Sequence, residues 1–162
     1  MVQHTHKEIT ILIIDDDKDI SDNLAEYLTE NGYSTTNTYT GQKGLELIKQ
    51  QHPHITLVEF KLPDINGIEL LKSIRTNSPE TIVILVSDYA TIDAIAESIK
   101  HGAYDFIAKP FSFNELELIL RRAIEKKTRR EKLTYLKRRN IILALTLPLW
   151  ALLGYLLINL FI

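Results

Sequence analysis

Five polar residues, each at the end of a short apolar run, have the types needed for one charged site. They are, in chain order, Asp15 and Asp16 after ILII, Glu59 after HITLV, Ser87 after TIVILV and Lys109 after DFIA. Clustered carboxylates repel unless a cation lies among them, and hard oxygen ligands favour Mg²⁺. A hydroxyl and a lysine beside them suit a phosphoryl group. Taken singly, a cap, a turn residue and a surface charge would explain Asp16, Ser87 and Lys109, so the joint placement is the informative observation.

The elements that would position these residues alternate along residues 8 to 125. Short runs of strand-forming residues are separated by stretches with helical spacing, and they are ITILII, STTNTY, HITLV, TIVILV and DFIA. Helix boundaries are indicated by Asp19 with Gly32, Asn66 with Glu69, Gly102, and Ser112 with Glu115. Five strands and five helices in β-α order predict an α/β fold with a doubly wound, five-stranded parallel sheet. Ligands of such sheets lie at the carboxyl ends of the strands, where all five polar residues fall.

The composition limits the chemistry and divides the chain. The chain of 162 residues contains no cysteine, which excludes disulfides, thiolate metal sites and cysteine nucleophiles. Residues 1–120 carry 9 Lys/Arg against 19 Asp/Glu, whereas residues 121–139 carry 10 against 2. An acidic body is therefore followed by a strongly basic segment, which we interpret as a solvated helical neck over residues 126–140.

A segment without charge follows the basic neck. Residues 141–162 read IILALTLPLWALLGYLLINLFI, and as a helix these 22 residues would be about 33 Å long. Apolar residues occupy every face, which favours a transmembrane helix over a buried core helix or an amphipathic surface helix. We therefore expect three parts, namely a domain over residues 8–125, the neck, and a C-terminal transmembrane helix.

Four segments carry a resemblance to a known family. ILIIDDD, LPDINGIEL, VSDYAT and GAYDFIAKPF together resemble the receiver domain of two-component response regulators, and GAYDFIAKPFSFNELELILRRAIE resembles receivers of nitrogen-regulation-type activators. The resemblance covers roughly residues 8–125 and implies a flavodoxin-like receiver fold. It also implies a role for each site residue: Asp15 and Asp16 serve Mg²⁺, Ser87 senses the phosphoryl group, Lys109 is its counter-charge, and Phe106 is the switch aromatic.

Glu59 departs from the pattern of that family, because receivers have an aspartate at the position of the phosphoacceptor. The extra methylene of glutamate moves the carboxylate by about an ångström, a displacement that can lower a rate about a hundredfold. Phosphorylation is therefore disfavoured. The longer side chain also carries negative charge toward Ser87 and Lys109, so Glu59 would partly imitate the phosphorylated state. The alternative is that Glu59 drifted after the acceptor role was lost and only occupies space.

Two functional classes remain open. The first is a non-enzymatic pseudo-receiver, tethered to the membrane, that binds a histidine kinase or membrane regulator through the face around Phe106. The second is a working phosphoacceptor that drains phosphoryl groups from a membrane histidine kinase. The chain has no GxxxxGK[ST] loop and we expect no DNA-reading domain, so direct transcriptional output is not expected.

The basic neck and its position set the expected localisation. Ten Lys/Arg before a membrane span are better explained by anionic lipid and topology than by nucleic acid. No Lys or Arg follows the span, so the positive-inside rule predicts a single-pass, tail-anchored protein of the bacterial inner membrane with residues 1–140 in the cytoplasm.

Overall fold

The computed structural model describes the backbone of residues 9–161 and, beyond Arg130, only part of the side chains. The described residues form five strands and five helices in strict alternation. The strands are β1 (Thr10–Ile14), β2 (Ser34–Thr38), β3 (Ile55–Glu59), β4 (Ile82–Ser87) and β5 (Asp105–Ala108). The helices are α1 (Lys18–Glu30), α2 (Gly41–Gln51), α3 (Gly67–Asn77), α4 (Ile92–Lys100) and α5 (Phe113–Phe161). The alternation predicted from the sequence is confirmed.

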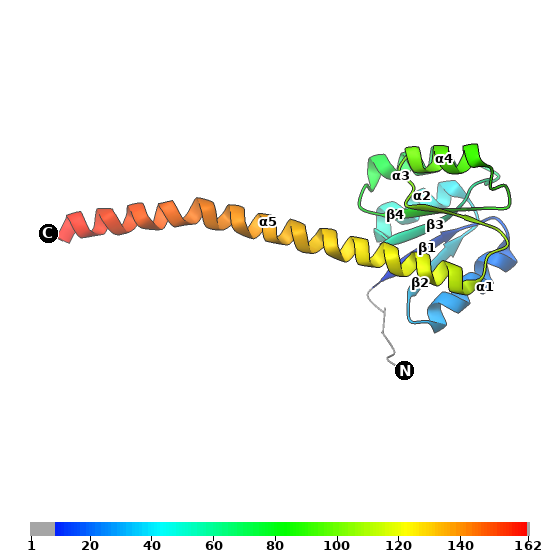
Figure 1. The fold of residues 1–162 in the computed structure, drawn as a ribbon, viewed down its shortest axis with the longest axis horizontal. Helices are drawn as coiled ribbons and strands as arrows, with labels where there is room; N and C mark the ends of the chain where they lie inside the picture. The colour runs from blue at the N-terminus through cyan, green and yellow to red at the C-terminus, as the bar shows by residue number, and fades with distance from the viewer. Residues whose placement is uncertain (1–8, 162) are drawn as a thin grey trace. The chain divides into compact units, whose positions relative to one another are not determined.

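The strands form one parallel sheet in the order β2-β1-β3-β4-β5. The order reverses direction next to β1, and α1 lies on one face of the sheet while α2, α3 and α4 lie on the other (Figure 1). This is the predicted doubly wound fold. The register pairs Glu59 with Val86 and Ser87 with Ala108, so the strands end together at one edge.

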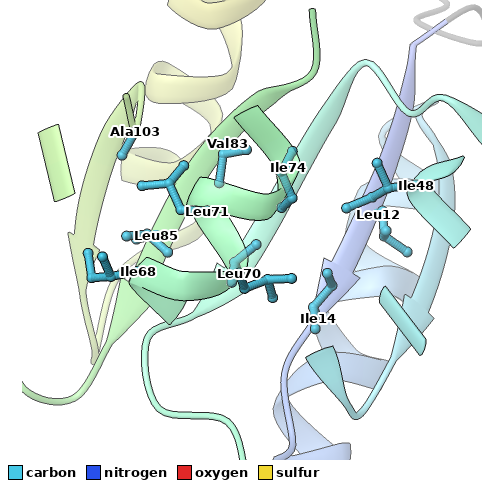
Figure 2. Packing of buried hydrophobic residues seen from close by; sticks show 11 residues of the cluster. Leu12, Ile14, Ile48, Ile68, Leu70, Leu71, Ile74, Val83, Leu85 and Ala103 are labelled. Atoms are coloured by element: carbon cyan, nitrogen blue, oxygen red, sulfur yellow. The ribbon is translucent and has the colours of Figure 1, made fainter. Parts of the chain in front are cut away.

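Burial on both faces explains why the central strands are almost wholly apolar. All five residues of β3 are buried, and β1 and β4 each expose only their first residue in part. On the face covered by α2 and α3, Leu70, Leu71 and Ile74 of α3 pack against the sheet (Figure 2). The members of this core cluster are Leu12, Ile14, Ile48, Val58, Ile68, Leu70, Leu71, Ile74, Val83, Leu85 and Ala103.

Of the three helix starts predicted from the sequence, those of α3 and α5 are confirmed and that of α1 is wrong. Asn66 caps α3 by accepting a hydrogen bond from the Ile68 N–H at 2.8 Å, as predicted. The predicted cap of α1, Asp19, is wrong, because Asp17 accepts the N–H of Ile20 at 3.1 Å and the helix begins at Lys18. Asp19 lies instead in the first turn of the helix, where an acidic side chain is also favourable, so its type alone did not distinguish the two positions.

The backbone divides into two units, Met1–Ile119 and Leu120–Ile162, and α5 runs through the boundary. In the first unit, the ring of Phe113 in the first turn of α5 stacks on Tyr27 of α1, with centroids 3.9 Å apart. In the second unit, the described cations of the basic segment are largely exposed.

The predicted boundaries are not settled by these observations. Among the described residues, no helix is both long and apolar enough to cross a membrane. Most side chains of the predicted span, residues 141–162, lie outside the described residues, as does Glu8 at the start of the predicted domain. The three-part division therefore stays a prediction.

Candidate functional site

A buried lysine lies between two carboxylates at the carboxyl edge of the sheet. Asp15 follows β1 and Glu59 ends β3, and Lys109 directly follows β5. Lys109 Nζ lies 2.6 Å from Asp15 Oδ2 and 2.7 Å from Glu59 Oε2. The side chain of Lys109 is only 6% exposed, as are those of its two partners. These three side chains, Asp15, Glu59 and Lys109, are called the strand-end cluster below.

The two oxygens of Glu59 have different surroundings. Oε1 accepts a hydrogen bond from the backbone N–H of Lys61 at 3.1 Å. Oε2 faces the ammonium of Lys109, but the contact lacks hydrogen-bond geometry, and no other donor among the described residues reaches this buried atom. In contrast, Lys109 donates a hydrogen bond to Asp15. Lys109 therefore forms a well-aligned hydrogen bond with Asp15 and a close ion pair with Glu59.

Burial and charge shift the pKa values of the pair. Burial raises the pKa of the Glu59 carboxyl above its ordinary value of 4.5, by more than Lys109 and the Lys61 N–H lower it. Burial lowers the pKa of Lys109, but Asp15 and Glu59 raise it by more, so it stands above 10.5. The raised pKa of Glu59 and the raised pKa of Lys109 are compatible, because the single ammonium of Lys109 offsets only one of the two carboxylate charges. The cluster carries a net charge of −1 when all three groups are ionised.

The other residues predicted for the site, Ser87, Asp16 and Phe106, do not belong to the strand-end cluster and have contacts of their own. Ser87 is fully buried at the end of β4, and its carbonyl accepts the backbone N–H of Lys109 at 2.8 Å. Asp16 is exposed. The ring of Phe106 is half-buried and meets the ring of Phe60 edge-on, with centroids 6.1 Å apart. Phe106 is thus joined to the residue that follows Glu59.

The oxygens at this edge suit a divalent cation. Asp15, Asp16 and Glu59 offer hard carboxylate ligands, and of these Asp15 and Glu59 already contact the ammonium of Lys109. With Asp16 included, three carboxylates and one lysine carry a charge of −2, which a divalent cation would neutralise. Among the described residues, however, no three His, Cys, Asp or Glu side chains already converge as a metal site.

The loop after β3 is held closely to the rest of the domain. A Cβ on Gly67 would lie 2.8 Å from both Cα and O of Phe60, so only glycine fits there. Asp64 accepts the backbone N–H groups of Gly41 and Gln42 at the start of α2, at 2.9 and 2.8 Å. Although burial raises the pKa of Asp64, these backbone donors lower it by more. The backbone that presents Glu59 is therefore fixed from two sides.

Two residues of the site edge were not singled out from the sequence. Lys61 and Tyr89 each lie two positions beyond a site residue, Glu59 and Ser87, and Lys61 Nζ lies 3.6 Å from the centroid of the Tyr89 ring. That equal spacing is the only signal in the sequence that could have indicated the pair.

A second surface of interest is the outer side of α4. Ile92, Ile95 and Ile99 form a stripe with exposed fractions of 86%, 37% and 46%. The side that faces the domain is made of small residues, since Ser98 is the buried residue of α4 and its hydroxyl donates to the carbonyl of Ala94 at 2.6 Å. The apolar side of this helix therefore faces outward, opposite to the usual arrangement. We call it the α4 stripe.

Comparisons with known proteins agree with this geometry. The chain is 32% identical over 126 residues to the regulatory protein AtoC of Escherichia coli, and 35% identical over 130 residues to the nitrogen assimilation regulatory protein NtrX of Azorhizobium caulinodans. These matches cover 78% and 79% of this chain but only 27% and 29% of those relatives. Sporulation initiation phosphotransferase F of Bacillus subtilis is 34% identical over 106 residues, which cover 65% of this chain and 86% of that protein.

The solved structures and the family models agree with the sequence relatives. A crystal structure of NtrX from Brucella abortus matches 78% of this chain and 29% of its own, with a TM-score of 0.74 and 31% identity. Residues 11–121 match the model of the response regulator receiver domain. With that match, the parallel sheet and the acids at its carboxyl edge, the chain belongs to the response regulator receiver domain family.

Proposed function

We propose that the chain is a membrane-tethered pseudo-receiver of a two-component system, which acts as a protein-interaction module without phosphorylation and without enzymatic activity. The observation that supports this most is the contact of 2.7 Å between Glu59 Oε2 and Lys109 Nζ. In this proposal Glu59 occupies the position of the phosphoacceptor, and its carboxylate already holds the lysine that a phosphoryl group would engage. The imitation is partial, because a carboxylate has one charge and two oxygens, and a phosphoryl group about two charges and three oxygens.

The geometry of the cluster supports the proposal that no phosphoryl group is accepted. The backbone of Glu59 is fixed by the contacts of Gly67 and Asp64, so it cannot retreat to compensate for the longer side chain. An in-line attack requires the carboxylate at a defined position, and an ångström of error can cost about a hundredfold in rate. Receiver domains commonly bind Mg²⁺, and in this proposal Asp15 and Asp16 would hold it. The ion would neutralise charge at the sheet edge.

Phosphorylation can be tested directly on the purified full-length chain. We expect intact-mass spectrometry to find no phospho-adduct after incubation with Mg²⁺ and acetyl phosphate, and we expect Glu59→Asp to gain one, since Asp15, Ser87 and Lys109 are all in place. An adduct on the unmodified chain that disappears in Glu59→Gln would contradict the proposal. That result would support the second candidate function, a phosphate sink for a membrane histidine kinase.

The α4 stripe supports an interaction role. Three exposed isoleucines on one helix form a contiguous apolar surface of the kind that marks protein contacts. It lies next to the face around Phe106, since α4 contacts β5, the strand to which Phe106 belongs. We propose that a histidine kinase or a membrane regulator binds there.

The basic neck and the uncharged segment support the membrane tether. We propose that residues 141–162 cross the bacterial inner membrane once, that the neck contacts anionic headgroups, and that the receiver domain lies in the cytoplasm. After cell fractionation, the chain should pellet with membranes, resist extraction by alkaline carbonate, and be digested by protease only when the cytoplasmic face is exposed. Release by high salt would instead mean that the neck alone holds the chain to the lipid surface.

A further inference from the structure

A group of polar contacts holds the first turns of α1 to the carboxyl end of β2. Asp22 of α1 accepts two hydrogen bonds at the same oxygen, Oδ1, one from the hydroxyl of Tyr39 at 2.9 Å and one from Nδ2 of Asn37 at 2.6 Å. The ammonium of Lys18, one turn earlier on the same side of α1, lies 5.3 Å from the centroid of the Tyr39 ring. Tyr39 therefore contacts α1 through both its hydroxyl and its ring. We call Asp22, Asn37 and Tyr39 the α1 clamp.

The acidic loop between β1 and α1 is attached to this end of β2 at both of its own ends. At its start, the backbone N–H of Asp15 donates to the carbonyl of Thr38, the last residue of β2, at 3.1 Å. At its end, Asp17 caps α1, and the clamp ties this helix to Tyr39, the residue that follows Thr38. The loop that contains Asp15 and Asp16 is therefore held by two adjacent residues of one strand end.

The position of α1 also affects the carboxylate of Asp15. The N–H of Asp17 donates to Asp15 Oδ1 at 3.0 Å, while Asp15 Oδ2 accepts a hydrogen bond from Lys109 at 2.6 Å. Because Asp17 is the N-cap of α1, a shift of this helix would move the donor that orients one oxygen of Asp15. The clamp is thus linked to that carboxylate through the first turn of α1.

We propose that the α1 clamp is a positioning device, which fixes the loop of Asp15 and Asp16 in the arrangement that a divalent cation requires and thereby raises the affinity for Mg²⁺. Groups that orient the ligands of a metal from outside strengthen its binding, because the ligands then need no rearrangement when the ion arrives. This inference rests on the proposed function, in which Asp15 and Asp16 hold Mg²⁺. It adds the residues that keep these two acids in place.

The alternative is that the clamp only attaches α1 to the domain. A second contact between the same two elements separates these explanations, because Thr29 Oγ1 of α1 lies 2.6 Å from Thr35 Oγ1 near the amino end of β2. This hydroxyl pair also attaches α1 to β2, but it lies toward the opposite end of the strand from the acidic loop. Thr35→Val is therefore the matched control, since it removes a side-chain hydrogen bond between α1 and β2 without releasing the loop.

The experiment measures the dissociation constant for Mg²⁺ of full-length variants by isothermal titration calorimetry. Tyr39→Phe removes the hydroxyl but keeps the ring against Lys18, and it should weaken Mg²⁺ binding about threefold, less than the roughly tenfold loss when a direct partner of a metal ligand is removed. Thr35→Val should leave the dissociation constant unchanged. In an Asp22→Ala background, Tyr39→Phe should add little, because its hydroxyl would have no acceptor to lose. Equal weakening in Tyr39→Phe and Thr35→Val, or none in either, would overturn the proposal.

Amide hydrogen exchange, measured by NMR without Mg²⁺, tests the clamp separately from the metal. The N–H groups of Asp15 and Asp17 should exchange at least about twofold faster in Tyr39→Phe, and at the rate of the unmodified chain in Thr35→Val. Unchanged exchange of both amides in Tyr39→Phe would overturn the clamp. If the unmodified chain bound no Mg²⁺, the role given to Asp15 and Asp16 in the proposed function would be contradicted, and the exchange rates alone would decide whether the clamp positions the loop.

Discussion

The strand-end cluster and the α4 stripe invert the usual distribution of residues in opposite ways. The cluster buries two carboxylates and a lysine, each 6% exposed in its side chain, whereas the stripe exposes isoleucine, up to 86% at Ile92. Charged residues are rarely buried unless paired, and large apolar patches on a surface usually mark a binding site. Both regions therefore depart from what stability alone would select.

The two regions also differ in how firmly the fold holds them. The cluster is formed by the ends of three strands, and the loop after β3 is held by Gly67 and by Asp64, which accepts a backbone N–H at the start of α2. The helix α4 is attached through small side chains such as Ser98, and its largest side chains contribute little to the core. We infer that the protein tolerates change at α4 and not at the cluster. Three experiments test this difference, from the largest expected effect to the smallest.

Removing the lysine of the cluster should have the largest effect on stability. Lys109→Met keeps most of the side-chain volume but leaves the carboxylates of Asp15 and Glu59 buried without their cation. Breaking one partner out of a buried ion pair costs about 3–5 kcal/mol, and we expect a loss of that size in the free energy of unfolding, measured by urea denaturation of the full-length chain.

An exposed lysine provides the matched control for that variant. Lys72 lies on the outer side of α3, and Lys72→Met should change the free energy of unfolding by no more than about 0.5 kcal/mol. Adding Glu59→Gln to Lys109→Met should restore part of the lost stability, because one of the two unpaired charges is removed. If Lys109→Met were as mild as Lys72→Met, the cluster would be no more constrained than the surface.

Protonation of Glu59 should change the stability of the folded chain by less than the removal of Lys109 does. Because its pKa is raised in the folded state, the folded chain holds this proton more tightly than the unfolded chain. Its contribution to stability is therefore greatest at acidic pH and falls as pH rises from 4.5 to the folded pKa. The midpoint of thermal unfolding, compared between the unmodified chain and Glu59→Gln, should show this fall only in the unmodified chain. The exposed Glu80→Gln should behave like the unmodified chain, and parallel curves for all three would contradict the prediction.

Substitutions in the α4 stripe should have the smallest effect on the free energy of unfolding and the largest effect on the binding of apolar molecules to the surface. Replacing Ile92 and Ile99 by serine should alter the free energy of unfolding by no more than about 0.5 kcal/mol per site, since both side chains are substantially exposed. The same change should reduce the fluorescence of an apolar dye such as ANS. A loss of several kcal/mol would mean that the stripe packs against the protein itself and is not available to a partner.

The sequence was sufficient for the fold because β1, β3, β4 and β5 are short, largely apolar runs bounded by turn residues, and the polar strand β2 is rich in threonine, which favours strands. The strand β3, for example, was expected at residues 54–58 and is observed at Ile55–Glu59. The sequence also placed Asp15, Glu59 and Lys109 at one edge, since parallel strands end together. The contacts of 2.6 and 2.7 Å needed the structure, because they depend on how far each side chain reaches.

Other features could not be obtained from local patterns. Isoleucines spaced as in Ile92, Ile95 and Ile99 usually indicate the buried side of a helix, and only the packing of Ser98 against the domain shows that they face outward. The contact between Lys61 and Tyr89 joins residues of two loops, so no periodicity along the chain encodes it. The roles of the individual site residues and the membrane span stay predictions.

The close approach of Gly67 to Phe60 has a consequence for the history of this protein. Because the backbone beside residue 59 packs closely against Gly67, we expect a glutamate and an aspartate to be attached at the same place. The codons of these two amino acids differ only in their third base, so a single nucleotide change would exchange one for the other without disturbing the loop. A single base change would therefore place at position 59 the aspartate that the resemblance to receivers implies there, and purifying selection at that base would reveal whether glutamate is required.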